Sequence, residues 1–333
     1  MDEKKSAIIL GALLHDIGKF MQRAELEKEF PEIELYYDDF CPTSTSYLHG
    51  AHSAFFIERL LPESLVNNNI KKELYNACRH HCNPQIADIY KMADRLSAGM
   101  ERFGEVKQNN KYKKIRLHSI FDNIEMSFSI KDSSDNYQPR WYYPLTQLNL
   151  KPDIFPLYEK EWEMKGRTVG SESLVREYND LWNQFIKELN DLKPLQNNNY
   201  HFIFNELFYL LQKYTWCIPS ATNVFPADIS LFDHLKTTAA IAACIYDSSM
   251  EGFEDDREFL LMGADISGIQ SFIFRIARAQ GIGGISKRLR GRSFYLMMLS
   301  EIICRHLLSS LDLTPANINF CGGGNMELLL PNT

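Results

Sequence analysis

The run AIILGALLHDIGKF at residues 7–20 is the sequence feature that most restricts the possible fold at the start of this chain. Its apolar residues predict a buried helix, yet that helix leads directly into the polar pair His15 and Asp16. Such a pair is costly to bury unless other groups compensate it. Imidazole nitrogens and carboxylate oxygens both bind divalent ions such as Mn, Co or Ni, so the pair predicts a metal site.

The chemistry of Asp16 favours two ions rather than one, because a carboxylate can bridge a pair of metals. Two ions roughly 3.5 to 4 Å apart hold the attacking water and the leaving oxygen of a phosphate ester. We therefore predict a dinuclear site that cuts phosphodiesters, with His15 and Asp16 as ligands and catalytic residues. Lys19 follows closely and is assigned as a third catalytic residue that contacts substrate phosphate. The alternative is a solvated lysine.

Further ligands must come from later helices. The stretch 46–61 (SYLHGAHSAFFIERLL) reads as a helix with His49 and His52 on one face. A lone histidine on an apolar face is more often a core residue, but five of the nine histidines lie within the first 81 positions. We predict His52 as a ligand; a second ligand from the same turn, His49, is conceivable but not required.

Two more predicted helices complete the set. KKELYNACRHHCNP at 71–84 carries His80 and His81 in its last turn. PQIADIYKMADRLSAGMER at 84–102 carries Asp94, which we prefer to Asp88 because Asp88 falls on another face. The predicted metal ligands are His15, Asp16, His52, His80, His81 and Asp94.

The composition limits the possible classes of protein but does not indicate a function by itself. The formal charge of -7 and the pI near 5.8 show no overall excess of basic residues for binding nucleic acid. Any nucleic-acid strand must therefore bind at a local basic patch, at metal ions or through partner subunits. The opening MDEKK lacks the features of a signal peptide, and no apolar run is long enough to span a membrane, so we expect a cytoplasmic protein. The seven cysteines form no Cys-x-x-Cys pair, which favours reduced thiols.

The predicted organisation is an α+β chain in four parts. Residues 1–104 form an all-helical domain, and residues 105–170, with short alternating stretches, form a small β-rich linker or insertion. Residues 171–256 are helical, and residues 257–333 form a different unit with alternating strands and helices.

Asp233 and His234 stand near the start of a predicted helix at 230–246. A second His–Asp metal constellation is conceivable there. We prefer a helix cap and a buried hydrogen bond.

The last unit predicts part of a ferredoxin-like βαββαβ fold. A strand ends at Asp265, two helices follow at 267–279 and 287–311, and a hairpin turns at 322–325. The closing helix and fourth strand are missing, so this unit is incomplete at its C-terminal end. Because a half-made sheet exposes an apolar face and a strand edge, we expect either a fragment or completion by another chain.

Several motifs together resemble one family, the large subunit of type III-A CRISPR interference complexes. The motifs are LLHDIGK, HH-x-x-P, ADRLSAGMER, SLFDHLKTTAAIAA, GADISGIQSFIF, SKRLRGRSFYL and the GGGN hairpin. The family has an N-terminal HD nuclease in a permuted arrangement and two palms related to GGDEF cyclases. Only fourteen residues precede His15, which agrees with the permutation.

The resemblance implies a nuclease that cuts single-stranded DNA while its complex is bound to target RNA through a guide RNA. Smaller subunits of the complex would be partners. It also implies synthesis of cyclic oligoadenylates from ATP, at a GGDD turn of the second palm. Here residues 322–325 read GGGN and offer no carboxylate for the cations of that reaction. We therefore expect no oligoadenylate from this chain alone.

The palm could still hold one ATP once completed. Backbone amides at the start of its first helix suit a phosphate, and we assign Asp265, Ser267, Gly268 and Gln270 to that site. The basic stretch 287–292 could contact phosphate or RNA, or be a solvated face or a partner interface.

Two other functions stay open. One is an HD phosphohydrolase of free nucleotides or cyclic dinucleotides, which would use the same ligands. The other is a non-catalytic scaffold whose metal site has decayed.

Overall fold

The computed structural model describes most of the chain in two compact units. The described residues are 2–43, 47–83, 85, 87–99, 105–106, 115–123, 140–158, 161–162, 173–192, 200–250, 259–275 and 284–332. One unit is Asp2–Thr238, here called the helical unit, and the other contains Ala239–Thr333, here called the palm unit. The helical unit combines the predicted first domain with later helices, and the four-part division of the sequence remains a prediction.

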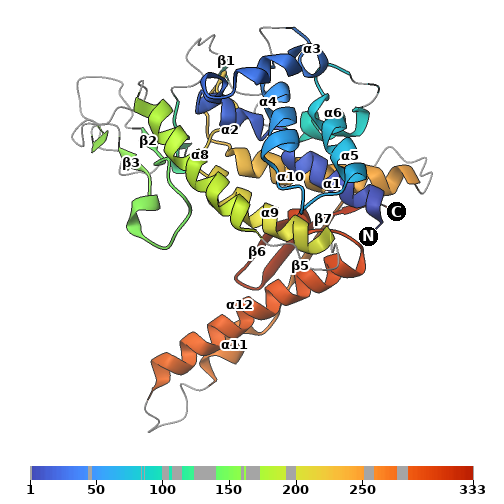
Figure 1. Ribbon diagram of the computed structural model, residues 1–333. Helices are drawn as coiled ribbons and strands as arrows, with labels where there is room; N and C mark the ends of the chain where they lie inside the picture. The colour runs from blue at the N-terminus through green and yellow to red at the C-terminus, as the bar shows by residue number, and fades with distance from the viewer. Residues whose placement is uncertain are drawn as a thin grey trace. The chain divides into compact units, whose positions relative to one another are not determined.

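The helical unit is built from helices that belong to two separate parts of the sequence (Figure 1). The early ones are α1 (Glu3–Leu14), α2 (Gly18–Arg23), α3 (Tyr37–Phe40), α4 (His49–Phe55), α5 (Asn68–Cys78) and α6 (Asp88–Ser97). Two 3-10 turns, η1 (Leu26–Lys28) and η2 (Pro31–Tyr36), lie between α2 and α3, and a π-helical turn, η3 (Phe56–Leu60), continues α4. The later ones are α8 (Ser173–Asp191), α9 (Tyr200–Thr215) and the first part of α10 (Leu231–Met250).

Helix α1 lies at the centre of this unit. Its residues are buried continuously from Lys5 to Leu14, and those from Ala7 onward are all apolar or glycine, as a buried helix requires. Asp2 caps its start by accepting a hydrogen bond from the Lys5 amide at 2.7 Å. A helix buried on all sides delivers whatever follows it into the interior, and here His15 and Asp16 follow.

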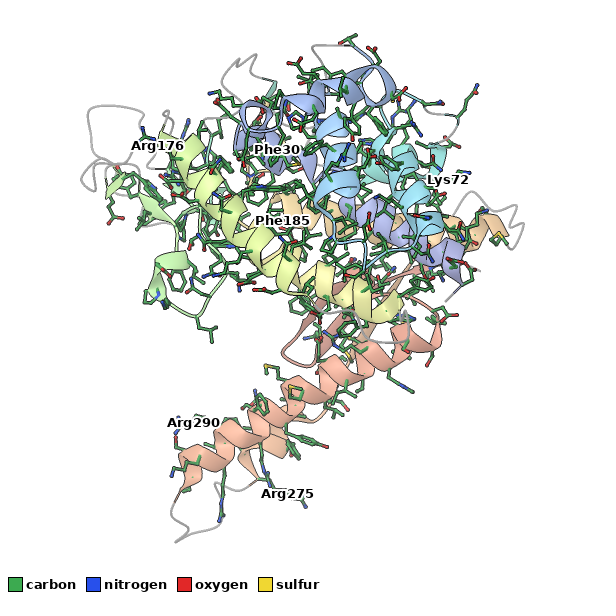
Figure 2. All side chains as sticks on the ribbon, viewed as in Figure 1. Phe30, Lys72, Arg176, Phe185, Arg275 and Arg290 are labelled. Carbon is green, nitrogen blue, oxygen red and sulfur yellow. The ribbon has the colours of Figure 1, made fainter. Side chains whose placement is uncertain are left out.

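Aromatic packing joins the late helices to the early ones. Phe20 of α2 meets Trp182 of α8 edge-on, with ring centroids 5.1 Å apart. Phe185, labelled in Figure 2, is buried on the same helix and stacks on Phe56. Helix α2 and the turn η3 are thereby held against α8, although α8 follows them only much later in the sequence.

The predicted β-rich linker contains short strands where it is described. Strand β1 (Glu105–Val106) pairs antiparallel with β4 (Val224–Phe225), and β2 (Trp141–Tyr142) pairs with β3 (Leu157–Tyr158). Two 3-10 turns, η6 (Ile120–Asn123) and η7 (Pro152–Ile154), complete this region. The predicted alternating stretch IEMSFSIKDSSDN lies outside the described residues.

The palm unit confirms the predicted order of strand, helices and hairpin (Figure 1). Its elements are β5 (Phe259–Asp265), α11 (Ile269–Phe274), α12 (Ile285–Ser310), the 3-10 turn η8 (Pro315–Asn317), β6 (Ile318–Gly322) and β7 (Asn325–Pro331). The sheet is antiparallel in the order β5-β7-β6. The hairpin turns on Gly323 and Gly324, whose φ angles of 61° and 92° favour glycine. The α+β fold class is confirmed.

One stripe of α12 covers the sheet, and other apolar groups of this unit are exposed. Leu296, Ser300, Cys304 and Leu308, each four residues apart, form the buried stripe. Leu261 of β5 and Phe320 of β6 are 59% and 54% exposed, and β5 and β6 are the edge strands of the described sheet. These exposed side chains agree with the prediction that the sheet leaves an apolar face uncovered. None of the helices described here is long and apolar enough to cross a membrane.

Candidate metal centre

His15 and Asp16 lie at the end of α1, where the chain turns toward α2. His15 caps the helix with right-handed backbone angles, and its Nδ1 donates to the Ala12 carbonyl at 2.7 Å. That bond keeps a hydrogen on Nδ1, so Nε2, which points into the interior, is the nitrogen that can bind an ion once it has lost its own proton. Both side chains are fully buried.

The next turn brings α2 unusually close to α4. The Gly18 amide donates to Ser53 Oγ at 2.9 Å. A Cβ on Gly18 would lie 2.1 Å from the His49 carbonyl oxygen and 2.6 Å from the Ser53 amide nitrogen, so only glycine fits. This approach brings His49 Nε2 to 3.2 Å from Asp16 Oδ1.

His80 and His81 lie in the turn that follows α5. The helix ends at Cys78, so the prediction that both histidines lie in its last turn was wrong by about one turn. His80 Nδ1 donates to the Ala77 carbonyl at 2.9 Å, and its Nε2 lies 3.7 Å from Asp16 Oδ1. The His81 ring is 3.9 Å from that of His80 and 5.1 Å from that of His49, centroid to centroid.

Asp94 and His234 meet His15 on the other side of Asp16. Asp94 Oδ1 lies 3.6 Å from His15 Nε2 and 3.2 Å from His234 Nε2. His234 Nε2 is also 3.4 Å from Asp16 Oδ2. The sequence interpretation preferred a helix cap and a buried hydrogen bond at Asp233 and His234. The capping oxygen belongs to Ser230, which accepts from the Asp233 amide, and the buried hydrogen bond is the one between His234 and Ser97. That interpretation missed the place of His234 beside the carboxylates.

The donor atoms fall into two groups that share one carboxylate. The first group is His15, Asp16, Asp94 and His234, and the second is His49, His80 and His81; within each, the ligand atoms lie within 4.8 Å of one another. Asp16 Oδ2 lies 3.4 Å from His15 Nε2, while Oδ1 faces His49 and His80. Asp16 therefore stands between the two groups with one oxygen toward each.

These spacings fit divalent ions. Two ligands about 2.1 Å from one ion lie roughly 3.0 to 3.4 Å apart at ordinary coordination angles. No residue in the described part of the chain forms a hydrogen bond with Nε2 of His15, His49, His80 or His234, although all four atoms are buried. Buried ring nitrogens beside carboxylates are unfavourable unless a proton or a metal ion lies between them.

His52 and Lys19 occupy different places from the ligands. His52 Nδ1 donates to the Leu48 carbonyl, and its Nε2 lies 3.5 Å from Glu27 Oε2, so the structure brings His52 into neither group. His49, which the sequence analysis left as an optional ligand, instead lies in the second group with His80 and His81. Lys19 Nζ lies 2.6 Å from Asp16 Oδ2 and is 19% exposed, at the edge of the centre.

The electrostatics separate the two groups. Burial opposes a charge on His15, but Asp16 and Asp94 outweigh it and raise the pKa of His15 from 6.5 to about 10. Burial lowers the pKa of His80 to about 3 and that of His49 well below its usual value. Despite burial, His15 and Lys19 hold the pKa of Asp16 well below its usual range. His49 and His80 are thus neutral and Asp16 is ionised at neutral pH, which is the state that binds metal.

The residues predicted to bind a nucleotide lie at one end of the palm sheet. Asp265 ends β5 opposite Asn325 of the hairpin, and Ser267 and Gln270 are exposed just beyond it. Gly268 precedes α11 with a φ of 76°. The Ile266 amide donates to the Gly324 carbonyl at 2.9 Å, which holds the hairpin against this turn.

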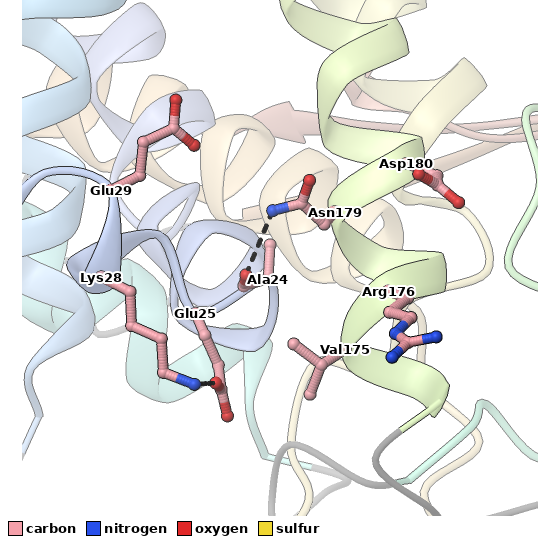
Figure 3. Close-up of a pocket in the computed structure, with 8 residues that line it drawn as sticks. All are labelled: Ala24, Glu25, Lys28, Glu29, Val175, Arg176, Asn179 and Asp180. Atoms are coloured by element: carbon pink, nitrogen blue, oxygen red, sulfur yellow. Dashed lines mark hydrogen bonds and ion pairs between the residues drawn. The ribbon is translucent and has the colours of Figure 1, made fainter.

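A separate cavity of about 380 Å³ lies between α8 and the segment that follows α2 (Figure 3). Its walls include an ion pair between Lys28 and Glu25 and a hydrogen bond from Asn179 to the Ala24 carbonyl. No residue of the two ligand groups lines it. The chemistry therefore points to the histidine groups, not to this cavity.

Comparison with known families defines the class of protein first. Residues 1–121 match the HD domain, and residues 258–333 match the Csm1 subunit domain B. The chain therefore joins an HD domain, which is a metal-dependent phosphohydrolase fold, to a Csm1-type palm.

Curated relatives make the relationship more specific. A CRISPR system single-strand-specific deoxyribonuclease Cas10/Csm1 (subtype III-A) from Methanocaldococcus jannaschii is 31% identical over 97% of this chain and 41% of its own length. The protein of that name from Streptococcus thermophilus is 27% identical over 100% of this chain and 41% of its own length. The chain is thus a relative of the Cas10/Csm1 proteins of subtype III-A, and it spans about 41% of the length of these two relatives.

Solved structures agree on the fold. A crystal structure of the Csm1–Csm4 cassette in complex with pppApApA matches with a TM-score of 0.64 and 23% identity, over 99% of this chain and 40% of that one. The crystal structure of Csm1 from T. onnurineus matches with a TM-score of 0.61 and 24% identity, over 100% of this chain and 40% of that one.

Proposed function

We propose that the helical unit binds two divalent transition-metal ions and cuts single-stranded DNA, as the nuclease part of an RNA-guided type III-A CRISPR complex. The observation that carries the proposal is the Asp16 carboxylate, whose two oxygens face the two ligand groups. The name that the relatives bear supports the choice of single-stranded DNA as substrate.

The chain's own residues divide the work. One ion would be held by His15, Asp94 and His234. The other ion would be held by His49, His80 and His81, and the Asp16 carboxylate would bind both ions. When bound, the two ions would activate water and stabilise charge on the phosphate. Lys19, at the edge of the centre, would hold a phosphate oxygen of the strand by its ammonium group.

The test uses the purified chain with Mn²⁺, Co²⁺ or Ni²⁺ and end-labelled single-stranded DNA. We expect cleavage with metal and none with a chelator, because the converging imidazoles and carboxylates are arranged to hold the ions that would activate the water. Duplex DNA, RNA and a cyclic dinucleotide serve as comparison substrates. Cleavage of the cyclic dinucleotide alone would assign the centre to an HD nucleotide phosphohydrolase. A chain that binds no metal at all would be a scaffold.

Metal binding should release a proton from His15. With a pKa of about 10, His15 carries a proton at neutral pH before an ion binds, and the ion must displace it. Raising the pH removes this competitor, so the affinity for Mn²⁺ should rise up to about tenfold per unit between roughly pH 6 and 9. Titration calorimetry in buffers with different ionisation enthalpies counts the protons. Binding without proton release would contradict this assignment.

For the palm unit we propose a part in binding one ATP, through Asp265, Ser267, Gly268 and Gln270, in a complete protein with a second palm. Their position at one end of the sheet, beside the hairpin, supports this. The turn 322–325 carries no carboxylate, so we expect this chain alone to make no oligoadenylate from ATP and Mg²⁺. Chromatographic detection of oligoadenylate would overturn that expectation.

A further inference from the structure

Ser97 connects two elements that carry ligands of the metal centre. It lies one turn after Asp94, at the end of α6, and its Oγ is 3.2 Å from His234 Nδ1. The same Oγ donates a hydrogen bond to the His234 backbone carbonyl at 3.1 Å. One hydroxyl therefore bonds both the ring and the backbone of a residue 137 positions away.

The hydrogen count fixes which ring nitrogen of His234 carries the proton. A serine hydroxyl has one hydrogen, and here the His234 carbonyl accepts it. Ser97 Oγ can then only accept from the ring, so Nδ1 is the donor and Nε2 keeps its lone pair. That lone pair belongs to the atom 3.2 Å from Asp94 and 3.4 Å from Asp16.

His234 obtains its orientation differently from two other histidines of the centre. His15 and His80 donate Nδ1–H to carbonyls of their own turns, at Ala12 and Ala77. His234 depends on a hydroxyl from another helix. Outer partners of this kind hold a ligand ring in the correct tautomer and rotation.

We propose that Ser97 is a positioning residue of the metal centre, which sets the tautomer of His234 and aims its Nε2 at the ion held with Asp94. This rests on the proposed function, since it presumes that His234 is a ligand. Because Ser97 follows Asp94 on the same helix, α6 supplies one ligand directly and orients a second.

The test measures the affinity of the full chain for Co²⁺ alone, by calorimetry and by the visible spectrum of the bound ion. In Ser97→Ala the His234 carbonyl still accepts from Thr238 Oγ1 at 2.8 Å, so the specific loss is the partner of Nδ1. We expect one of two ions to bind about 10 to 100 times more weakly. Ser97→Thr keeps the hydroxyl and should restore the affinity.

Two controls separate this role from a general structural one. Ser6→Ala removes a comparable bond from a serine hydroxyl to a backbone carbonyl, at 2.8 Å in α1, and should leave Co²⁺ binding unchanged. His234→Ala sets the largest loss expected at that ion. Equal affinity in wild type and Ser97→Ala, or a Thr variant as weak as the Ala variant, would overturn the role of Ser97. A wild-type chain that binds no Co²⁺ would instead overturn the metal centre itself.

Discussion

Replacing Asp16 with asparagine should abolish cleavage of single-stranded DNA and reduce the bound metal from two ions to one or none. The substitution keeps the shape of the side chain but removes the charge that both ligand groups face. Loss of several kcal/mol of charge stabilisation corresponds to a rate roughly 1,000-fold lower or more. Elemental analysis of the purified variant and a single-turnover cleavage assay measure the two effects.

Asp88→Asn is the matched control for this variant. It makes the same chemical change at an exposed carboxylate at the start of α6, outside both ligand groups. Its metal content and cleavage rate should equal those of the wild type. If Asp16→Asn kept two ions and its activity, the bridging role of Asp16 would be refuted.

Replacing Gly18 with alanine should destabilise the helical unit and weaken the second ligand group. The new Cβ would meet two backbone atoms of α4, the His49 oxygen and the Ser53 nitrogen, neither of which can rotate away. Separating α2 from α4 should lower the free energy of unfolding by about 3 kcal/mol. All four tryptophans, at 141, 162, 182 and 216, belong to this unit, so their fluorescence during urea unfolding reports it specifically.

Gly291→Ala provides the comparison, because a Cβ at that position of α12 meets nothing within 4 Å. Alanine is also the better helix former, by about 1 kcal/mol. We expect tryptophan-detected unfolding to be unchanged in this variant. A Gly18→Ala protein as stable as the wild type would mean that α2 and α4 are not held at the observed distance.

Local sequence signals were sufficient to predict the residues of the metal centre that lie at the end of α1. The apolar run before His15 and Asp16 predicts a buried helix that delivers both residues inside, and the structure places them there. The order of strands and helices in the palm unit was equally accessible, because each element has its own periodicity and the hairpin has its glycines. Helix ends were less exact, as α5 shows.

The choice between His49 and His52 could not be made from periodicity. Residues three apart share a helix face, so either could meet Asp16. The decision depends on how closely α2 approaches α4, which is a tertiary contact set by Gly18 and Ser53. His234 was missed for a related reason, because it lies more than 200 residues from His15.

The carbonyl bonds of His15 and His80 have a consequence for how the centre is assembled. Each ring is already held by a hydrogen bond to its own turn, so the orientation of the ring does not require a bound ion. Metal could then exchange in a finished protein rather than be captured during folding. A single preparation from which the metal is removed should bind different divalent ions when each is added in turn. The metal that is bound would then depend on which ion is available as well as on the ligands.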